Sequence, residues 1–117
     1  MSETVALIMK RKVLAQSLMR LTREEKGIQM YFQPDYADAD VVIRGCGASC
    51  ALIEVAESGE YDVAYCLALC AWLKKETPAC KLLLLCPEND EECISEVVTA
   101  KRAGKIDDFI FYDTSLE

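Results

Sequence analysis

The chain lacks histidine altogether and is poor in positive charge, and both features limit what it can bind. Its 117 residues include 13 lysines and arginines against 20 aspartates and glutamates, for a formal net charge of −7 at pH 7. A surface of this sign repels a phosphate backbone, because binding to nucleic acid depends on cationic side chains that replace counterions. We therefore expect no direct nucleic-acid binding by this domain.

Long hydrophobic runs, targeting signals and repeats are missing as well. Every apolar stretch is far shorter than the roughly 20 residues that cross a bilayer as a helix, and residues 1–4 lack the basic start of a secretory signal. No internal repeat, low-complexity tract or linker interrupts the chain. A length of 117 residues with 52% apolar content suits one ordinary core. We expect a single cytoplasmic domain, residues 1–117, with no membrane contact.

Cysteine, in contrast, is abundant. No two of the seven cysteines have the C-x-x-C spacing of zinc sites, so no metal or other cofactor is predicted. Cys66 and Cys70 share a helical stripe with Val63, Leu67 and Leu73, where a free cysteine behaves as a small hydrophobic residue. Reduced, largely buried thiols are expected, and a cysteine-based redox or metal sensor is the alternative. The cysteines lie at positions 46, 50, 66, 70, 80, 86 and 93.

Five short apolar segments have the length and composition of β-strands. The most distinctive contains four consecutive leucines between Lys81 and Cys86, is bounded by Pro78 and Pro87, and is too short for an independent helix. We expect it to be a central strand. The apolar and β-branched content of residues 50–55 suggests a strand that is buried on both faces. The five predicted strands are residues 5–9, 28–32, 50–55, 81–86 and 109–112.

Helical segments separate these strands, at about residues 13–26, 36–44, 59–76 and 89–104. Gly27 ends the first of them, and Gly104 lies where a left-handed residue would end the last. Asn89 is the expected N-cap of the last helix, with Glu92 three residues later as in a capping box. Strands that alternate with helices of this length predict right-handed crossovers and an α/β fold with a parallel sheet.

Five residues, Lys10, Arg11, Glu54, Cys86 and Tyr112, lie where the predicted strands end. The carboxyl ends of parallel strands meet at one edge of the sheet, which is where open α/β folds keep their chemistry. We therefore expect these five side chains to share one rim.

The pattern resembles the receiver domain of two-component response regulators, a CheY-like (flavodoxin-like) doubly wound fold with five parallel strands in the order 2-1-3-4-5. The segment ALIEV (51–55) resembles the phosphoacceptor strand of that family, and ETPACKLLLLCPENDEE (76–92) resembles its fourth-strand region. AGKIDDFIFYD (103–113) resembles the A-G-A-x-D-F-L-x-K closing strand. ALIMKRKVLAQSLMRL (6–21) is similar to the first strand and helix of regulators of the NarL/LuxR type, in which the receiver is the N-terminal domain.

The resemblance also implies that the phosphorylation site is degenerate. In the family, two acids after the first strand hold Mg²⁺, and an aspartate at the end of the third strand accepts the phosphoryl group. Lys10 and Arg11 occupy the positions of the two acids, and cations are not ligands for Mg²⁺, which requires oxygen donors. The resemblance therefore implies a pseudo-receiver without enzymatic activity. The alternative is that Lys10 and Arg11 are a solvated pair in a loop.

Glu54 takes the phosphoacceptor position with a side chain one methylene longer than aspartate. Its charge would lie farther from the strand, as a built-in mimic of phosphorylation, and Lys10 or Arg11 would form an ion pair with it in place of the metal. Two alternatives stay open. Glu54 is either a solvated strand end or an unusual phosphotransfer acceptor.

Cys86 and Tyr112 take the positions of two further family residues. Cys86 replaces the threonine or serine that bonds the phosphoryl group, and a thiol is a poor donor. It either packs in the core or, with its pKa lowered by Lys10 and Arg11, senses oxidants. Tyr112 replaces the family lysine, and its hydroxyl group either donates to Glu54 or lies in water.

The chain has only five residues after Tyr112, whereas receivers continue into a fifth helix. We expect that helix to be missing or truncated, which would uncover apolar surface of the sheet. That surface would be covered by the output domain of a longer protein or by homodimerisation, and the first is favoured. The predicted function is interaction with a protein partner or the chain's own output domain through the fourth helix and fifth strand. Transcription regulation is the output that relatives suggest.

Overall fold

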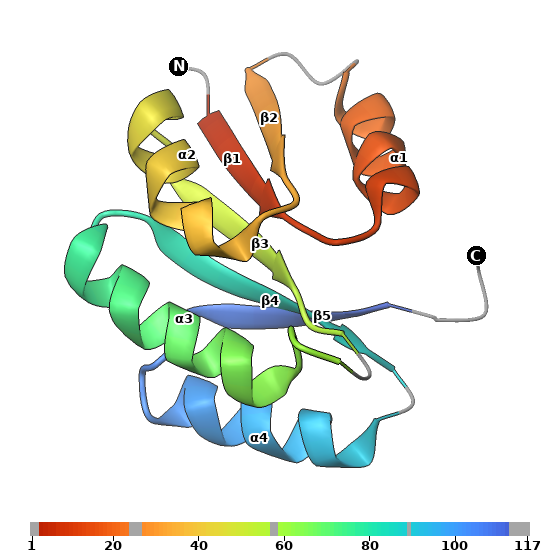
Figure 1. The fold of residues 1–117 in the computed structure, drawn as a ribbon, viewed down its shortest axis with the longest axis vertical. Coiled ribbons are helices and arrows are strands. Elements are labelled where there is room, and N and C mark those ends of the chain that lie inside the picture. Colours follow the sequence, from red (N-terminus) through yellow and green to blue (C-terminus); the bar gives the residue numbers. More distant parts are fainter. Residues whose placement is uncertain (1–2, 24–26, 57–58, 89, 113–117) are drawn as a thin grey trace.

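The computed structural model describes residues 3–23, 27–56, 59–88 and 90–112. These residues form one α/β domain, in which a twisted sheet has helices on both faces (Figure 1). The predicted fold class is confirmed: the strand order is β2-β1-β3-β4-β5, and every neighbouring pair is parallel. The strands are β1 (Glu3–Ile8), β2 (Ile28–Gln33), β3 (Cys50–Glu54), β4 (Lys81–Pro87) and β5 (Asp108–Tyr112).

The helices are divided unequally between the two faces of the sheet. One face carries only α1 (Lys12–Thr22), and the other carries α2 (Ala39–Cys46), α3 (Val63–Glu76) and α4 (Glu91–Arg102) (Figure 1). A 3-10 helix, η1 (Tyr36–Asp38), leads into α2. The larger apolar core therefore lies between the sheet and α2, α3 and α4.

Strand β4 shows why the sheet is buried on both sides. Its side chains alternate, so Leu82 and Leu84 belong to the large core while Leu85 joins the smaller core under α1. Cys66 and Cys70 are buried in the large core, as their helical stripe predicted. All seven cysteines are free thiols.

The helix boundaries correct the sequence prediction in three places. The segment predicted as one helix over 36–44 is η1 followed by α2, and α3 begins at Val63 rather than near residue 59. The N-cap of α4 is Asp90, whose carboxylate accepts the N–H of Cys93 at 3.1 Å. Aspartate and asparagine cap helices equally well, so composition alone did not separate Asp90 from Asn89, which lies outside the described residues.

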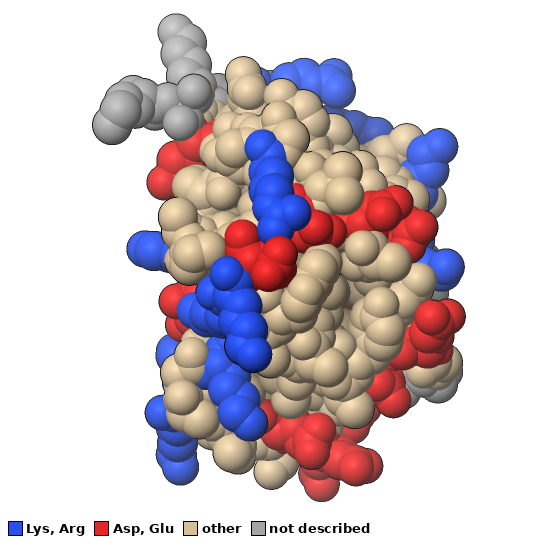
Figure 2. Space-filling model, turned by 60° about the vertical axis from the view of Figure 1, so that its left-hand side comes forward, with Lys and Arg blue, Asp and Glu red and all other residues tan. Residues whose placement is uncertain are grey.

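The charges of the helices follow their direction. Helices α3 and α4 end in basic residues (Lys74, Lys75, Lys101 and Arg102), whereas α4 begins with acidic ones. Basic side chains near a helix C-terminus and acidic ones near its N-terminus oppose the helix dipole and stabilise the helix. On the face shown in Figure 2, basic side chains gather in a column at the left and acidic ones at the lower right.

The described residues end at Tyr112 in β5, so the expectation that the fifth helix is missing or truncated concerns residues 113–117, which lie outside them. On β5, Ile110 remains 47% exposed and Phe111 41% exposed. Within the described part of the chain, no helix is long and apolar enough to cross a membrane.

Candidate functional site

Glu54, the last residue of β3, is the centre of a polar cluster at the carboxyl edge of the sheet. Its side chain is only 3% exposed, although the edge faces solvent. Glu54 Oε1 accepts the backbone N–H groups of Lys10 at 2.8 Å and Arg11 at 3.1 Å. Glu54 Oε2 accepts the Nε–H of Arg11 at 2.6 Å, which forms an ion pair. Both carboxylate oxygens are therefore held by the loop that follows β1.

This clasp also places a carboxylate at the N-terminus of α1. Arg11 is the N-cap residue of that helix, but its own side chain does not cap it, and the first turn contains no acid. Glu54 brings a carboxylate from another strand to the N-terminus of α1, where the helix dipole favours negative charge. Glu54 therefore interacts favourably with the N-terminus of α1 as well as with the Arg11 side chain.

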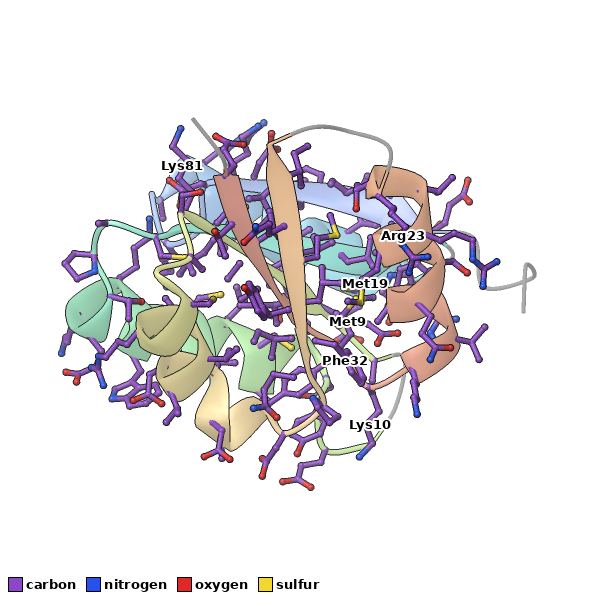
Figure 3. The ribbon with its side chains drawn as sticks, turned by 90° about the horizontal axis from the view of Figure 1, so that it is seen from above. Met9, Lys10, Met19, Arg23, Phe32 and Lys81 are labelled. Atoms are coloured by element: carbon purple, nitrogen blue, oxygen red, sulfur yellow. The ribbon has the colours of Figure 1, made fainter. Side chains whose placement is uncertain are left out.

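Lys10 contributes to the cluster through its backbone, while its side chain points elsewhere. Lys10 Nζ lies 5.3 Å from the centre of the Tyr61 ring, a cation–π contact, and in Figure 3 the side chain lies near the loops at the bottom of the view. Of the two cations that the sequence places beside Glu54, the structure pairs Arg11 with the carboxylate. A planar guanidinium group bonds a carboxylate more directionally than an ammonium group does.

A group of tyrosines supports the main chain of Glu54, and sequence analysis missed it. The hydroxyl of Tyr36 donates to the Glu54 carbonyl at 2.6 Å, and its ring stacks on Tyr61 with centroids 3.9 Å apart. Tyr65 meets Tyr61 edge to face at 5.0 Å. Burial raises the pKa of Tyr36 well above the ordinary value, so its hydroxyl stays a donor. The available signal was that Tyr36 and Tyr61 follow strand ends.

Tyr112 closes the other side of the cluster. Its hydroxyl donates to the Val55 carbonyl at 3.0 Å, which is neither of the two arrangements expected from sequence. The Arg11 guanidinium carbon lies 4.5 Å from the centre of the Tyr112 ring. Arg11 therefore contacts both the end of β3 and the end of β5, and one side chain links three elements of the rim.

Cys86 lies in the large core, without exposure to solvent. A hydrogen bond with the Cys93 thiol and burial both raise the pKa of Cys86 far above the usual value for cysteine. The prediction that Lys10 and Arg11 lower the pKa of Cys86 is wrong, because the hydrogen bond with Cys93 and burial raise it. Of the two roles considered for Cys86, the geometry supports packing.

The residues at this rim do not fit a magnesium ion. Mg²⁺ requires several oxygen ligands in near-octahedral geometry, and the rim offers one carboxylate with both oxygens occupied by N–H donors. Lys10 and Arg11, which follow β1, bring cations to this rim and no oxygen ligands from their side chains. No group of three or more potential metal ligands occurs among the described residues.

Comparison with known proteins gives a match in structure alone. No family model matches the sequence, and no curated protein matches it. An orphan response regulator of H. pylori superposes with a TM-score of 0.72 at 19% identity, over 94% of this chain and 82% of that chain. A response regulator from Thermotoga maritima gives 0.71 at 19% identity, over 95% and 85%. The isolated receiver domain of RcsB from Salmonella enterica, crystallised with phosphomimetic BeF₃⁻, gives 0.72 at 11%, over 95% and 78%.

These neighbours are receiver domains, so the fold of this chain is the CheY-like fold of response-regulator receivers. Identities below 20% establish the fold without a shared chemistry. Within that fold, the rim described here combines one buried carboxylate with an arginine and two tyrosines. It is this rim that bears on function.

Proposed function

We propose that the chain is an atypical receiver domain of two-component-type signalling, which acts by protein–protein interaction without Mg²⁺-dependent aspartyl phosphorylation. In this proposal Glu54 stands in the phosphoacceptor position and Arg11 stands where an acid would hold the metal. Lys10, Cys86 and Tyr112 take the remaining positions of the degenerate site. The domain is a binding module of the cytoplasm and not an enzyme.

The observation that supports this proposal is the occupied carboxylate of Glu54. Phosphoryl transfer needs an acceptor oxygen that can attack phosphorus and a metal ion that neutralises the phosphoryl oxygens. Both Glu54 oxygens accept N–H groups, and Arg11 forms an ion pair with one of them. The positive charge that a metal would bring is thus already supplied by a side chain, and that side chain blocks the acceptor.

The same contacts favour one fixed state of the rim. In a switch, the rim would need two arrangements of similar free energy that a ligand separates. Here Arg11 joins Glu54 and Tyr112, while Tyr36 holds the Glu54 carbonyl from below. A rim assembled in this way keeps the domain ready for a partner, and regulation then depends on whether the partner is present.

The partner surface in this proposal is α4 with β5 and the adjacent loops. Exposed apolar residues on β5, Ile110 and Phe111, would bind either an output domain of the same protein or a separate protein, with homodimerisation as the other possibility. Control of transcription through such an output domain follows the LuxR-family neighbours, one of which is a DNA-binding response regulator from Staphylococcus aureus.

Intact-mass measurement tests the proposal directly. The protein is incubated with Mg²⁺ and acetyl phosphate, beside a receiver known to be phosphorylated. The mass of this chain should stay unchanged while the mass of the reference receiver rises by one phosphoryl group. A phosphoryl adduct on Glu54 would refute the proposal and make the chain a phosphotransfer acceptor.

A gain-of-function variant tests the assignment of positions. Lys10→Asp and Arg11→Asp, combined with Glu54→Asp, Cys86→Thr and Tyr112→Lys, should create Mg²⁺ affinity that isothermal titration detects, because the acids and the cation are restored. The matched control carries Lys74→Asp and Lys75→Asp instead of the first two changes and should bind no Mg²⁺. If neither variant gains affinity, the positions are assigned wrongly.

A further inference from the structure

Strand β2 forms an outer edge of the sheet, and its free side is open. The strand pairs only with β1, because it stands first in the order β2-β1-β3-β4-β5. Figure 3 looks onto this edge, with α1 on one side of β2 and η1 and α2 on the other. No other described strand or helix covers it there. The free edge therefore lies at the surface, between two helical walls.

The backbone groups on the free edge can be assigned from the pairing on the other side. The carbonyl of Gly27, just before β2, accepts the N–H of Glu3 in β1, and the carbonyl of Gln33 accepts the N–H of Met9, just after β1. Backbone direction alternates along a strand, so every second residue from Gly27 to Gln33 faces β1. The N–H and C=O groups of the intervening residues point outward. These residues are Ile28, Met30 and Phe32.

This edge lacks the features that usually keep a strand from pairing. The sequence of β2 is IQMYFQ, which contains no charged residue, no proline and no glycine. Edge strands in monomeric proteins are usually protected by lysine, proline or a bulge, because an unprotected row of N–H and C=O groups pairs with another chain. An unprotected six-residue strand is thus suited to accept a further strand.

A groove runs between this edge and α1. It consists of two hollows of about 480 and 300 Å³, and Met19 and Arg23 line both of them. In Figure 3 these two side chains lie on the side of α1 that faces β2, with Met19 nearer to Phe32. The lining is apolar at its floor and polar on the α1 wall. The remaining lining residues are Lys12, Gln16, Arg20, Thr22, Ile28, Gln29, Met30, Tyr31 and Phe32.

The α1 wall of the groove is positively charged, although the chain as a whole is acidic. Lys12, Arg20 and Arg23 are exposed, and no ion pair joins them to another described residue. No acidic residue occurs from position 4 to position 23. Glu24 and Glu25 follow in the chain, outside the described residues. The groove is therefore a local positive field on a domain of net charge −7.

The spacing of these cations matches an extended chain. Lys12 and Arg20 are eight residues apart on a helix, about 12 Å along its axis, and four residues of a β-strand span about 13 Å. Side chains at every second position of an added strand would face α1, on the side of the sheet where Met30 and Phe32 also lie. Acidic side chains at those positions would meet the cations in register.

We propose that β2 and α1 form a docking groove for an acidic segment of a partner protein, which adds to β2 as a sixth strand. Main-chain hydrogen bonds to Ile28, Met30 and Phe32 give the segment its position. Lys12, Arg20 and Arg23 select for glutamate or aspartate at alternate positions. This groove lies at the opposite edge of the sheet from β5, so it goes beyond the partner surface proposed above.

Charge argues against a second copy of this chain as the occupant. Two β2 strands paired about a twofold axis would bring two α1 helices side by side on the same face of a continuous sheet. Lys12, Arg20 and Arg23 of one copy would then lie near those of the other, and like charges in such positions repel. An acidic strand from a different protein removes that repulsion and replaces it with attraction.

Synthetic peptides test the proposal. The probe is a fluorescein-labelled peptide of seven alternating glutamate and valine residues, and its binding to the full chain is followed by fluorescence anisotropy. Binding should weaken with rising salt, and the same peptide with lysine in place of glutamate should not bind. Equal binding of the acidic and the basic peptide would overturn the charge assignment.

Backbone methylation separates strand addition from simple charge attraction. Two further probes carry N-methyl groups on all valines or on all glutamates, which blocks one edge of the peptide or the other without changing its charge. One of the two should lose at least about tenfold in affinity, because a strand pairs through one edge only. If both bind as well as the unmethylated probe, no strand is added and the proposal fails.

Charge reversal on the protein completes the test. Arg20→Glu with Arg23→Glu should weaken binding of the acidic probe about tenfold, since two exposed attractions become repulsions. The matched control, Lys75→Glu with Arg102→Glu, changes the net charge equally on α3 and α4 and should bind as the parent does. An equal loss of affinity in both variants would refute the proposed groove. A dimer of this chain that does not bind the probe, detected by sedimentation analysis, would refute it as well. None of these results depends on the phosphorylation state of Glu54.

Discussion

Two ion-paired carboxylates stand at opposite ends of the same sheet, and they differ mainly in burial. Glu54 at the carboxyl end is 3% exposed and accepts two backbone N–H groups and the Arg11 side chain. Asp107, which precedes β5 at the amino end, has a 37% exposed side chain. It accepts the N–H of Leu82 at 2.8 Å and an ammonium proton of Lys74 at 3.0 Å. The two sites thus use the same kinds of donor.

Similar contacts therefore contribute differently to stability, depending on how far they are buried. A charge pair screened by water contributes at most about 1 kcal/mol, whereas breaking a buried pair leaves an unpaired charge and costs about 3 to 5 kcal/mol. Asp107 therefore fastens the start of β5 to β4 at small net gain. Glu54 is the site where the fold depends on its partner, and a functional role at the carboxyl end is consistent with that dependence.

The largest effect should come from removing the cation at the buried end. Arg11→Leu leaves the Glu54 charge with backbone donors only and should lower the free energy of unfolding by about 2 kcal/mol, below the full cost because Arg11 is 27% exposed. Urea denaturation measures the change. Arg20→Leu on the same helix is the control and should shift stability by less than about 0.5 kcal/mol. Equal effects would mean that Glu54 and Arg11 do not depend on each other.

The neutralised carboxylate gives a second test at the same end. Glu54→Gln keeps a similar shape but removes the charge that pairs with Arg11. It should lower the free energy of unfolding by about 1.5 kcal/mol in the parent chain. In a chain that already carries Arg11→Leu, the same substitution should cost less, because the ion pair is already gone. A double-mutant cycle from urea curves measures this coupling. Additive losses would contradict the ion pair as a stabilising contact.

A smaller loss of stability is expected when the neutral hydroxyl donor of Tyr36 beside Glu54 is removed. Tyr36→Phe removes the hydroxyl that donates to the Glu54 carbonyl but keeps the ring stacked on Tyr61, so the cost should be about 1 kcal/mol. Thermal unfolding followed by circular dichroism measures it. Tyr31→Phe removes a hydroxyl that donates to exposed Gln29 at 3.5 Å, and this control should leave the melting temperature unchanged. A matching drop in the control would argue against a specific role of Tyr36.

The smallest effect belongs to the exposed end, and it depends on pH. The N–H of Leu82, together with Lys74, lowers the pKa of Asp107, so the charged form is favoured in the folded state. Asp107→Asn should therefore cost about 0.5 kcal/mol at neutral pH, and the difference from the parent should vanish as pH falls through the lowered pKa. Urea curves across the acid range test this. A difference that persists or grows in acid would contradict the sign.

Much of the fold followed from local patterns. Four leucines between prolines predicted the central strand β4, and alternation of strands and helices predicted the parallel sheet. The strand order came from the resemblance to receiver domains. These patterns are local because side-chain periodicity and helix punctuation depend on neighbours in sequence. The predicted N-cap of α4 was wrong by one residue, since asparagine and aspartate side chains offer equivalent acceptors and the N-cap is Asp90.

The candidate site was predicted in part. Glu54 lay at a strand end next to the loop that carries Lys10 and Arg11, so their proximity followed from the topology once the sheet was parallel. The environment of Cys86 did not follow from local patterns. Its distance from solvent depends on α4, which packs against β4 and places Cys93 beside it.

Short-range periodicity sets where each strand ends, so the sequence alone was enough to bring Lys10, Arg11 and Glu54 to the carboxyl rim. The contacts among the rim side chains depend on tertiary packing. Arg11 rather than Lys10 pairs with Glu54, Tyr36 supports the carbonyl, and Tyr112 donates to the end of β3. Such choices depend on side-chain directions and burial across elements distant in sequence, and the energies that separate them arise when those elements pack together.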